Sequence, residues 1–403
     1  MKKRLFHLTG RGIICLCLAL GLMLSPAVAP SVAFAAGETV TIESSVSEDV
    51  HGNAATDAGT GGPTQDPNNN TVHITTNGDV DGDVFGAETA TPGVEDSAVA
   101  DNTVNIDDDG KVDGNVFGGR AETTTGAAIA EGNTVDISGA AEVSGGTQGV
   151  AGGAAIATTG TATAEGNTVN IGDTAVVAAD RIVGGDAFTD TGNATASGNF
   201  VNISGTADVT SNAVLGGYAE ATGNAGIATA FGNFVGILGD VANWVIGGEA
   251  RSTSGAATAR DNVVIIDGDA VGVAGGKAVS ISGIATARDN EVTMTGGTTT
   301  GSVSGGEARS DSGAATASIN EVTIMDGIVG GSVYGGFAEN LSGTATAEVT
   351  NNIVTIDGGT VVDGVYGGRA ESATGTAQAT HNSVTVNGEA QGSGQVPVAL
   401  RPE

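Results

Sequence analysis

The stretch GVYGGRAESATGTAQATHNSVTV, residues 364–386, decides the fold, because its parts recur along most of the chain. A β-branched residue precedes a Gly pair, an alanine-rich segment follows, and an Asn then opens an alternating apolar segment. This Asn occurs eleven times at intervals of 28 to 34 residues, always with Val two residues later. Ile stands four residues after it in nine copies. The positions are Asn70, Asn102, Asn133, Asn167, Asn199, Asn233, Asn262, Asn290, Asn320, Asn352 and Asn382.

The Gly pair and the alanine-rich segment recur in most units, with Ala both five and three residues before the Asn in eight copies. Nine of ten pairs have Ala three residues after the first Gly, and the first copy reads Gly86-Ala87. Each unit therefore holds three short extended segments joined by Gly, Asn, Asp and Ser turns. A single unit cannot bury its apolar side, whereas stacked units bury one another's. We expect an all-β fold, a three-sided parallel β-solenoid of about eleven coils with like strands ~4.8 Å apart, and a ladder of the recurrent Asn rather than exposed turn residues.

The chain divides into four parts. Residues 1–35 are expected to be a signal peptide, because Lys2, Lys3 and Arg4 precede a short apolar run and an A-x-A site. Residues 36–69 are expected to form a cap and a loose leader, residues 70–390 the repeats, and residues 391–403 a flexible tail. Both cysteines lie in the signal segment, so disulfides contribute nothing to the mature chain. We expect export, and no transmembrane segment in the mature chain.

Charge and composition restrict the partners and the core. The sequence has 14 basic and 46 acidic residues, and four of the basic ones lie in the signal segment, so the mature chain carries 10 − 46 = −36. This charge repels nucleic acid and anionic lipid. With 39% hydrophobic residues, disorder is not expected. Aromatic residues make up 3% beside 68 glycines, which indicates a narrow core of small side chains.

The units GNVFGGRAE (114–122) and GSVYGGFAE (331–339), with the stretch quoted first, resemble the passenger repeats of bacterial autotransporters. The resemblance covers nearly all of residues 70–390. It implies a passenger displayed on the cell surface or shed, often adhesive, at an outer membrane. The implied partners are host or bacterial cell surfaces, extracellular matrix or glycans. Such passengers precede a membrane barrel, but this sequence ends in VALRPE. We therefore expect a separate barrel, a secreted passenger or a truncated gene product.

Two other functions compete with the adhesive one. An enzyme on a pectin-lyase-like β-helix needs a non-repeating cluster of acids and a base in a cleft, whereas the charged positions here repeat or scatter. A trimeric autotransporter head has stacked NSVAIG-like units that residues 382–386 resemble, but those units recur at about half the present period. No G-x-S-x-G, phosphate loop or Cys–His arrangement occurs. We expect no catalytic residue and no cofactor.

One candidate binding surface is a stripe of apolar and aromatic residues directly before the Gly pairs. By alternation with the inward β-branched residue, these side chains face outward. The stripe either binds a surface or glycan, or it is covered by the insertions at one corner of the coil. Its members are Phe85, Phe117, Leu215, Ile246, Tyr334 and Tyr366.

Other polar residues are weaker candidates. Asp107, Asp109 and Asp113 imitate the start of a calcium loop, although solvated turns are the alternative. A stacked column of acidic and basic side chains is expected to fix the register of successive coils and to have no catalytic role. His51, His73 and His381 lie far apart and suggest no metal site, and Trp244 is expected to pack. The column contains Glu249, Lys277 and Glu307, and Arg120 and Arg369 hold the same place in other coils.

Overall fold

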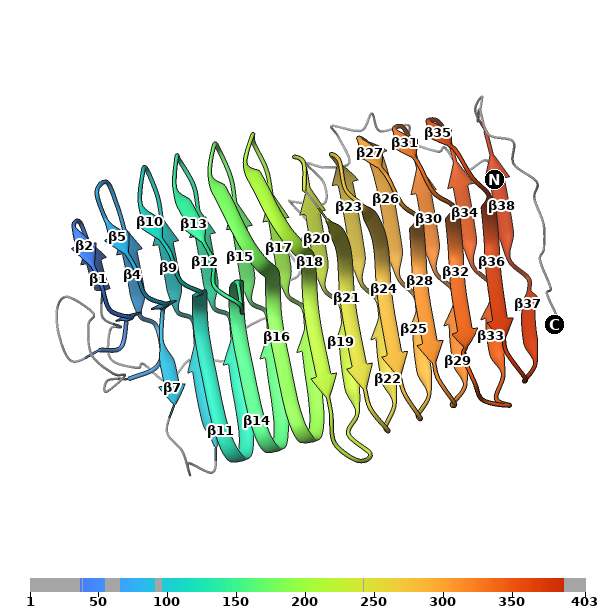
Figure 1. Ribbon diagram of the computed structural model, residues 1–403, viewed down its shortest axis with the longest axis horizontal. Coiled ribbons are helices and arrows are strands. Elements are labelled where there is room, and N and C mark those ends of the chain that lie inside the picture. Colours follow the sequence, from blue (N-terminus) through green and yellow to red (C-terminus); the bar gives the residue numbers. More distant parts are fainter. Residues whose placement is uncertain (1–36, 38, 55–65, 91–95, 242, 388–403) are drawn as a thin grey trace, which may run out of the picture. The chain divides into compact units, whose positions relative to one another are not determined.

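The computed structural model describes residues 37, 39–54, 66–90, 96–241 and 243–387. Within these ranges every regular element is a β-strand, and each strand pairs in parallel with the equivalent strand of the neighbouring turn. Figure 1 shows the strands side by side in chain order, from β1 (Thr39–Ile42) in blue to β38 (Ser383–Val386) in red. The predicted parallel β-solenoid is confirmed.

One sheet of twelve strands is formed by the segments that follow the recurrent Asn. Strand β1 adds one turn before the first such Asn, because Val40 pairs with Val72 and Ile42 with Ile74. The segment expected to be a cap therefore contains a turn of the solenoid. The strands are β1 Thr39–Ile42, β4 Thr71–Ile74, β9 Thr103–Ile106, β12 Thr134–Ile137, β15 Thr168–Ile171, β17 Phe200–Ile203, β20 Phe234–Ile237, β23 Val263–Asp267, β26 Glu291–Gly296, β30 Glu321–Ile324, β34 Ile353–Ile356 and β38 Ser383–Val386.

A second sheet, of twenty-three strands, holds the Gly-pair and alanine-rich segments. In the first half of the stack the two segments often merge into one long strand. The Gly-pair strands are β3 Val50–His51, β6 Val84–Phe85, β7 Glu88–Ala90, β21 Trp244–Ser252, β24 Gly272–Ser280, β28 Val303–Ser310, β32 Val333–Asn340 and β36 Val365–Ser372. The alanine strands are β8 Ser97–Ala100, β19 Ala228–Phe231, β22 Ala257–Arg260, β25 Ala285–Arg288, β29 Ala315–Ser318, β33 Ala347–Thr350 and β37 Ala377–Thr380. The merged strands are β11 Val116–Glu131, β14 Val150–Glu165 and β16 Val176–Ser197, whereas the long strand β18 Asp208–Ala221 ends before the alanine strand β19.

A fourth segment, which the repeat analysis did not identify, lies between the Asn strand and the Gly pair. It contributes buried side chains to the core, as Val112, Val177 and Val329 illustrate, and in some turns more than one, since Ala175 and Ala179 are buried beside Val177. The variable stretch that was expected to bulge at a corner thus contains a wall of the solenoid, which we call the third wall. Its short strands are β2 Ser45–Val46, β5 Asp79–Val80, β10 Lys111–Val112 and β13 Glu142–Ser144 in the second sheet, and β27 Thr298–Thr299, β31 Ile328–Val329 and β35 Thr360–Val361 in a third sheet.

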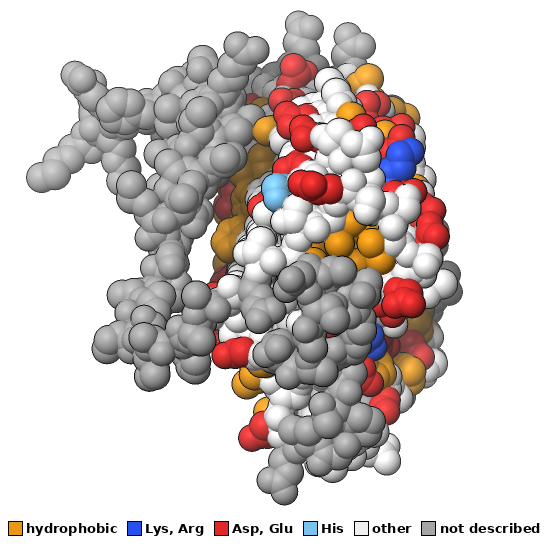
Figure 2. Space-filling view, turned by 90° about the vertical axis from the view of Figure 1, so that its left-hand side faces the viewer, with side chains coloured by type: hydrophobic (Ala, Val, Ile, Leu, Met, Phe, Trp, Pro, Cys, Tyr) orange, Lys and Arg blue, Asp and Glu red, His pale blue; other side chains and the backbone are white. Residues whose placement is uncertain are grey.

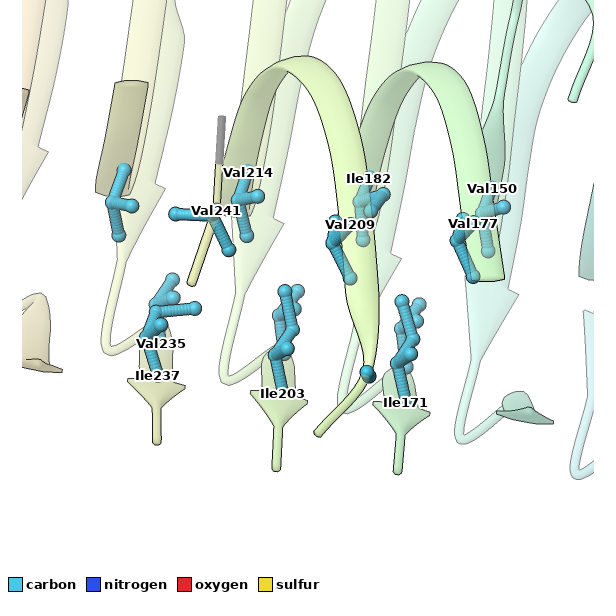
Figure 3. Close-up of a cluster of buried hydrophobic side chains, with 14 of the residues drawn as sticks. Val150, Ile171, Val177, Ile182, Ile203, Val209, Val214, Val235, Ile237 and Val241 are labelled. Atoms are coloured by element: carbon cyan, nitrogen blue, oxygen red, sulfur yellow. The ribbon is translucent and has the colours of Figure 1, made fainter. Parts of the chain in front are cut away.

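The interior consists of two separate cores. The larger is a column of Val and Ile enclosed by the Asn strands, the third wall and the start of the Gly-pair strands. Figure 3 shows Ile203, Val209 and Val214 meeting from these three walls. The smaller core is almost entirely Ala, as with Ala121 against Ala130, and lies between the Gly-pair and alanine strands. Methyl side chains let these two layers approach closely, which explains the low aromatic content.

The recurrent Asn forms a continuous buried ladder, as predicted. Asn167 donates its backbone N–H and its Nδ2–H to Oδ1 of Asn199, at 3.0 Å and 3.1 Å. The second Nδ2 hydrogen goes to the Ala130 carbonyl, 2.9 Å away. Between Asn70 and Asn382, each ladder carboxamide therefore uses both donors and accepts two hydrogen bonds in a region closed to water, where such bonds reinforce one another.

The Gly pair is required by close packing around this ladder. A Cβ atom on Gly184 would overlap the Gly216 carbonyl oxygen of the next turn, and one on Gly185 would overlap the Asn199 carboxamide. The first Gly therefore makes room for the backbone of the next turn, and the second Gly makes room for the Asn ladder.

The residue before each ladder Asn has a left-handed backbone. At all eleven positions φ lies between 55° and 65°. Gly, Asp or Asn occupies nine of these positions, which suits a conformation that these residues adopt with little strain. The exceptions are Ile319, at φ 58°, and His381, at φ 57°.

Candidate functional site

The most distinctive surface feature is a double column of side chains on either side of the Gly pairs, which we call the outer seam. The residues before the pair alternate with inward-facing Val or Ile, and those after it alternate with inward-facing Ala, so both point outward. The first column contains His51, Phe85, Phe117, Ala151, Val183, Leu215, Ile246, Ala274, Ser304, Tyr334 and Tyr366. The second contains Glu88, Arg120, Ala154, Asp186, Tyr218, Glu249, Lys277, Glu307, Phe337 and Arg369.

Side chains of the two columns pack against each other. Phe117 packs with Ala154 in one apolar cluster, and the Arg120 guanidinium lies 5.8 Å from the centroid of the Phe117 ring. Leu215 packs with Tyr218 in a second cluster. The outer seam therefore buries side chains that face away from both cores.

This burial corrects the predicted binding stripe. Phe85 and Phe117 are 3% exposed, and Leu215 and Ile246 are buried in the same way. They share apolar clusters with the neighbouring column across the Gly pair, as Phe117 does with Ala154 and Leu215 with Tyr218. The stripe therefore presents no continuous apolar surface, and only Tyr334 and Tyr366 among its predicted members are partly exposed.

At the N-terminal end of the outer seam three rings stack. His51 lies 4.8 Å from Phe85, and Phe85 lies 5.3 Å from Phe117, with planes nearly parallel. Burial lowers the pKa of His51, and the nearby carboxylates of Asp49 and Asp83 oppose this only in part. Burial likewise raises the pKa of Glu88, although Arg120 at 3.1 Å favours its charged form.

The middle of the outer seam holds a charged network around Tyr218. The Tyr218 hydroxyl donates to Glu220 at 2.8 Å, and burial raises the pKa of Tyr218. The Arg181 guanidinium lies 5.0 Å from the Tyr218 ring centroid and forms an ion pair with Asp186 at 3.1 Å. Burial raises the pKa of Asp186, against the effect of Arg181.

The predicted acid–base column lies in the second column of the outer seam. Glu249 pairs in register with Lys277, and Lys277 with Glu307. Glu249 is 4% exposed and accepts ion pairs from Arg251 at 2.8 Å and Lys277 at 3.4 Å. These contacts neutralise a buried carboxylate, as a structural column would.

At the C-terminal end of the outer seam the rings are partly exposed. Tyr334 stacks on Tyr366 with a centroid distance of 5.2 Å, and Phe337 lies 5.8 Å from Tyr334. Arg369 donates from Nη1 to the Tyr334 hydroxyl at 3.0 Å and from Nε to Glu371 at 2.6 Å. The guanidinium also lies 5.8 Å from the centroids of both the Tyr334 and Phe337 rings.

The candidate calcium residues are not brought together. Asp107 contacts the His73 ring at 2.7 Å, and Asp109 accepts a hydrogen bond from the Asn77 backbone at 3.3 Å. Asp113 follows the third-wall strand β10. Within the described ranges, no group of three His, Cys, Asp or Glu side chains has a metal-binding arrangement.

Two further features differ from expectation or were missed. Trp244 is not packed in the interior, because it is 37% exposed. Its ring lies over Gly272, where an added Cβ would be 2.7 Å from Cζ3 of Trp244. The left-handed residue before each Asn was missed, although its restriction to Gly, Asp or Asn in nine copies is visible in the sequence. The arginine contacts across the outer seam have no comparable repeat signal.

No family model, no curated protein and no solved structure matches this chain. In the part of the chain that the structure describes, no helix has the length and apolar character to cross a membrane.

Proposed function

We propose that the chain is an exported structural and adhesin-like protein, displayed on the cell surface or secreted, as the passengers that it resembles are. In-register repetition of outward-facing side chains is the observation that supports this proposal. In the alanine-rich segments, six half-buried threonines follow one another, one per turn. They are Thr163, Thr195, Thr229, Thr258, Thr286 and Thr316.

Such a column repeats one weak contact at each turn. Linked weak contacts act together and bind an extended surface more strongly than any one of them. The proposed partners are host or neighbouring bacterial cell surfaces, matrix or glycans. Acidic side chains dominate the charged surface at the β1 end in Figure 2, and this favours uncharged or cationic partners over polyanions.

Removing whole turns tests the adhesive role. Deletion of residues 263–290 joins Asn262 to Glu291, and a further deletion of residues 291–320 joins Asn262 to Glu321, so the repeat stays in phase. We expect adhesion of the purified protein to cultured epithelial cells and to bacterial cells to fall by a graded amount with each turn removed. Adhesion that is absent from the full chain, or that is the same at every length, would contradict the proposal.

The export part of the proposal has its own test. Residues 1–35 lie outside the described residues. Production of the full chain in a bacterium with an outer membrane should give an exported product that begins at Ala36, measured by N-terminal sequencing. A product that stays in the cytoplasm with its first residues intact would contradict export.

A further inference from the structure

The aromatic side chains at the C-terminal end of the outer seam are more accessible than those at its N-terminal end. Tyr334, Phe337 and Tyr366 are half-buried, whereas Phe85 and Phe117 in the same seam are 3% exposed. Strand β36 is the last Gly-pair strand of the described chain, so no further described turn covers the face of Tyr366 that points away from Tyr334.

The ring of Tyr366 lies beside a glycine of its own turn. It lies against Gly364, where an added Cβ would overlap the ring, and the equivalent residue of the preceding turn is Ser332. Among the described residues the Tyr366 hydroxyl has no hydrogen-bond partner, whereas the Tyr334 hydroxyl accepts from Arg369. Within the described ranges, Tyr366 thus combines a half-buried ring with a hydroxyl that has no hydrogen-bond partner.

Polar groups beside the rings are held in fixed positions. Arg369 is oriented by both Glu371 and Tyr334, and Arg309 lies 5.4 Å from the Phe337 ring centroid while approaching Glu339 at 3.7 Å. These carboxylates and guanidinium groups offer charge-assisted hydrogen bonds to hydroxyl groups at the rim of the rings.

We propose that Tyr366, Tyr334, Arg369 and Glu371 form a binding site for an uncharged pyranose, such as a residue of a β-linked glucan. The flat C–H face of such a ring stacks on Tyr366, and its hydroxyls bond to the Tyr366 hydroxyl, Glu371 and Arg369. This inference rests on the proposed surface-binding function and names a ligand class for it.

The charges at the site select against the other ligands that aromatic rings bind. Arg369 already occupies the cation position over Tyr334 and Phe337, so a quaternary ammonium would meet a like charge. Glu339 and Glu371, together with a net charge of −32 for the chain, repel acidic polysaccharides. An uncharged sugar avoids both penalties.

Titration calorimetry on the full chain tests the site, with cellohexaose, hexagalacturonate and choline as probes. We expect cellohexaose to bind, Tyr366→Ala to weaken its affinity about tenfold or more, and Tyr366→Phe to weaken it about threefold through the lost hydroxyl. The matched control is Phe234→Ala, because Phe234 is half-buried and packs against Phe200 on the outer face of the first sheet. This control should bind as the unsubstituted chain does.

Several results would overturn the inference. These are no binding of cellohexaose at millimolar concentration, equal affinity in Tyr366→Ala, or tighter binding of choline or hexagalacturonate. Circular dichroism melting of each variant verifies that the solenoid is intact, and Tyr366→Phe keeps the test valid if Tyr366→Ala unfolds the last turn. Adhesion that persists without sugar binding would refute this site alone, whereas sugar binding without adhesion would refute the proposed function.

Discussion

The carboxamide of Asn199 occupies the space that a Cβ atom on Gly185 would require. The two residues lie on different segments of one turn, and their contact separates the Val/Ile core from the alanine core. The second Gly, present in nine of the ten pairs, is therefore a consequence of the Asn ladder.

This contact predicts that substitutions of Gly185 and Asn199 have coupled effects on the free energy of unfolding. Gly185→Ala should lower the free energy of unfolding by about 1–3 kcal/mol through overpacking, and Asn199→Ala should lower it by about 1–3 kcal/mol because buried ladder groups lose partners. The double variant should be less destabilised than the sum, since removal of the carboxamide makes room for the methyl group. Urea denaturation of the four proteins measures this, and strict additivity would show that the contact does not matter.

The third wall can be tested with two neighbouring residues of β16. Val177 is fully buried and Val176 is 43% exposed. Val177→Asp should destabilise the solenoid by about 4 kcal/mol or more, because it places an unpaired carboxylate in the Val/Ile core. Val176→Asp is the matched control and should change the free energy of unfolding by about 0.5 kcal/mol or less. Equal melting temperatures of the two variants would exclude the third wall from the core.

Replacement of Ile319 should stabilise the protein. This residue is 56% exposed and has a φ of 58°, where a β-branched side chain is strained. Ile319→Asn should raise the free energy of unfolding by about 1 kcal/mol, because Asn tolerates this backbone. Ile281→Asn is the control, since Ile281 is also exposed but is not among the positive-φ residues. An unchanged or lower melting temperature for Ile319→Asn would contradict the assignment of strain.

The stacked His51 should make the protein sensitive to mild acid. Burial lowers its pKa from 6.5, so the unfolded chain takes up a proton more readily than the folded one. Stability contributed by the neutral ring is therefore present above 6.5 and is lost as pH falls below it. In His51→Phe the fall in melting temperature between about pH 7.5 and about pH 5 should be smaller than in the unsubstituted chain. Glu88 should affect stability in the opposite direction. Because its pKa is raised, the stability that it contributes declines as pH rises above 4.5. An unchanged pH dependence in His51→Phe would show that His51 is not the sensitive group.

The structural features that repeat can be predicted from the sequence, and those without a clear repeat signal cannot. The Asn ladder and the parallel register follow from spacing alone, because identical residues at one period must stack. The third wall was missed because its buried residues, such as Val112 or Val177, lie within a stretch of variable length. The fate of Phe85 and Phe117 also could not be predicted, because alternation gives the direction of a side chain but not the contact across the Gly pair that covers it.

The ladder gives the solenoid a direction. Each ladder Asn before Asn382 donates its backbone N–H and one Nδ2 hydrogen toward the following turn, as Asn167 does to Asn199. Its other Nδ2 hydrogen goes to a carbonyl of the preceding turn, as in the bond from Asn167 to Ala130. Loss of a turn from the C-terminal side therefore leaves two N–H groups of the new last Asn without acceptors, whereas loss from the N-terminal side leaves one. Buried N–H groups without an acceptor are rare and poorly tolerated. We therefore expect stepwise truncation to be asymmetric, with fraying and proteolysis advancing more readily from the C-terminal edge once a turn has been removed.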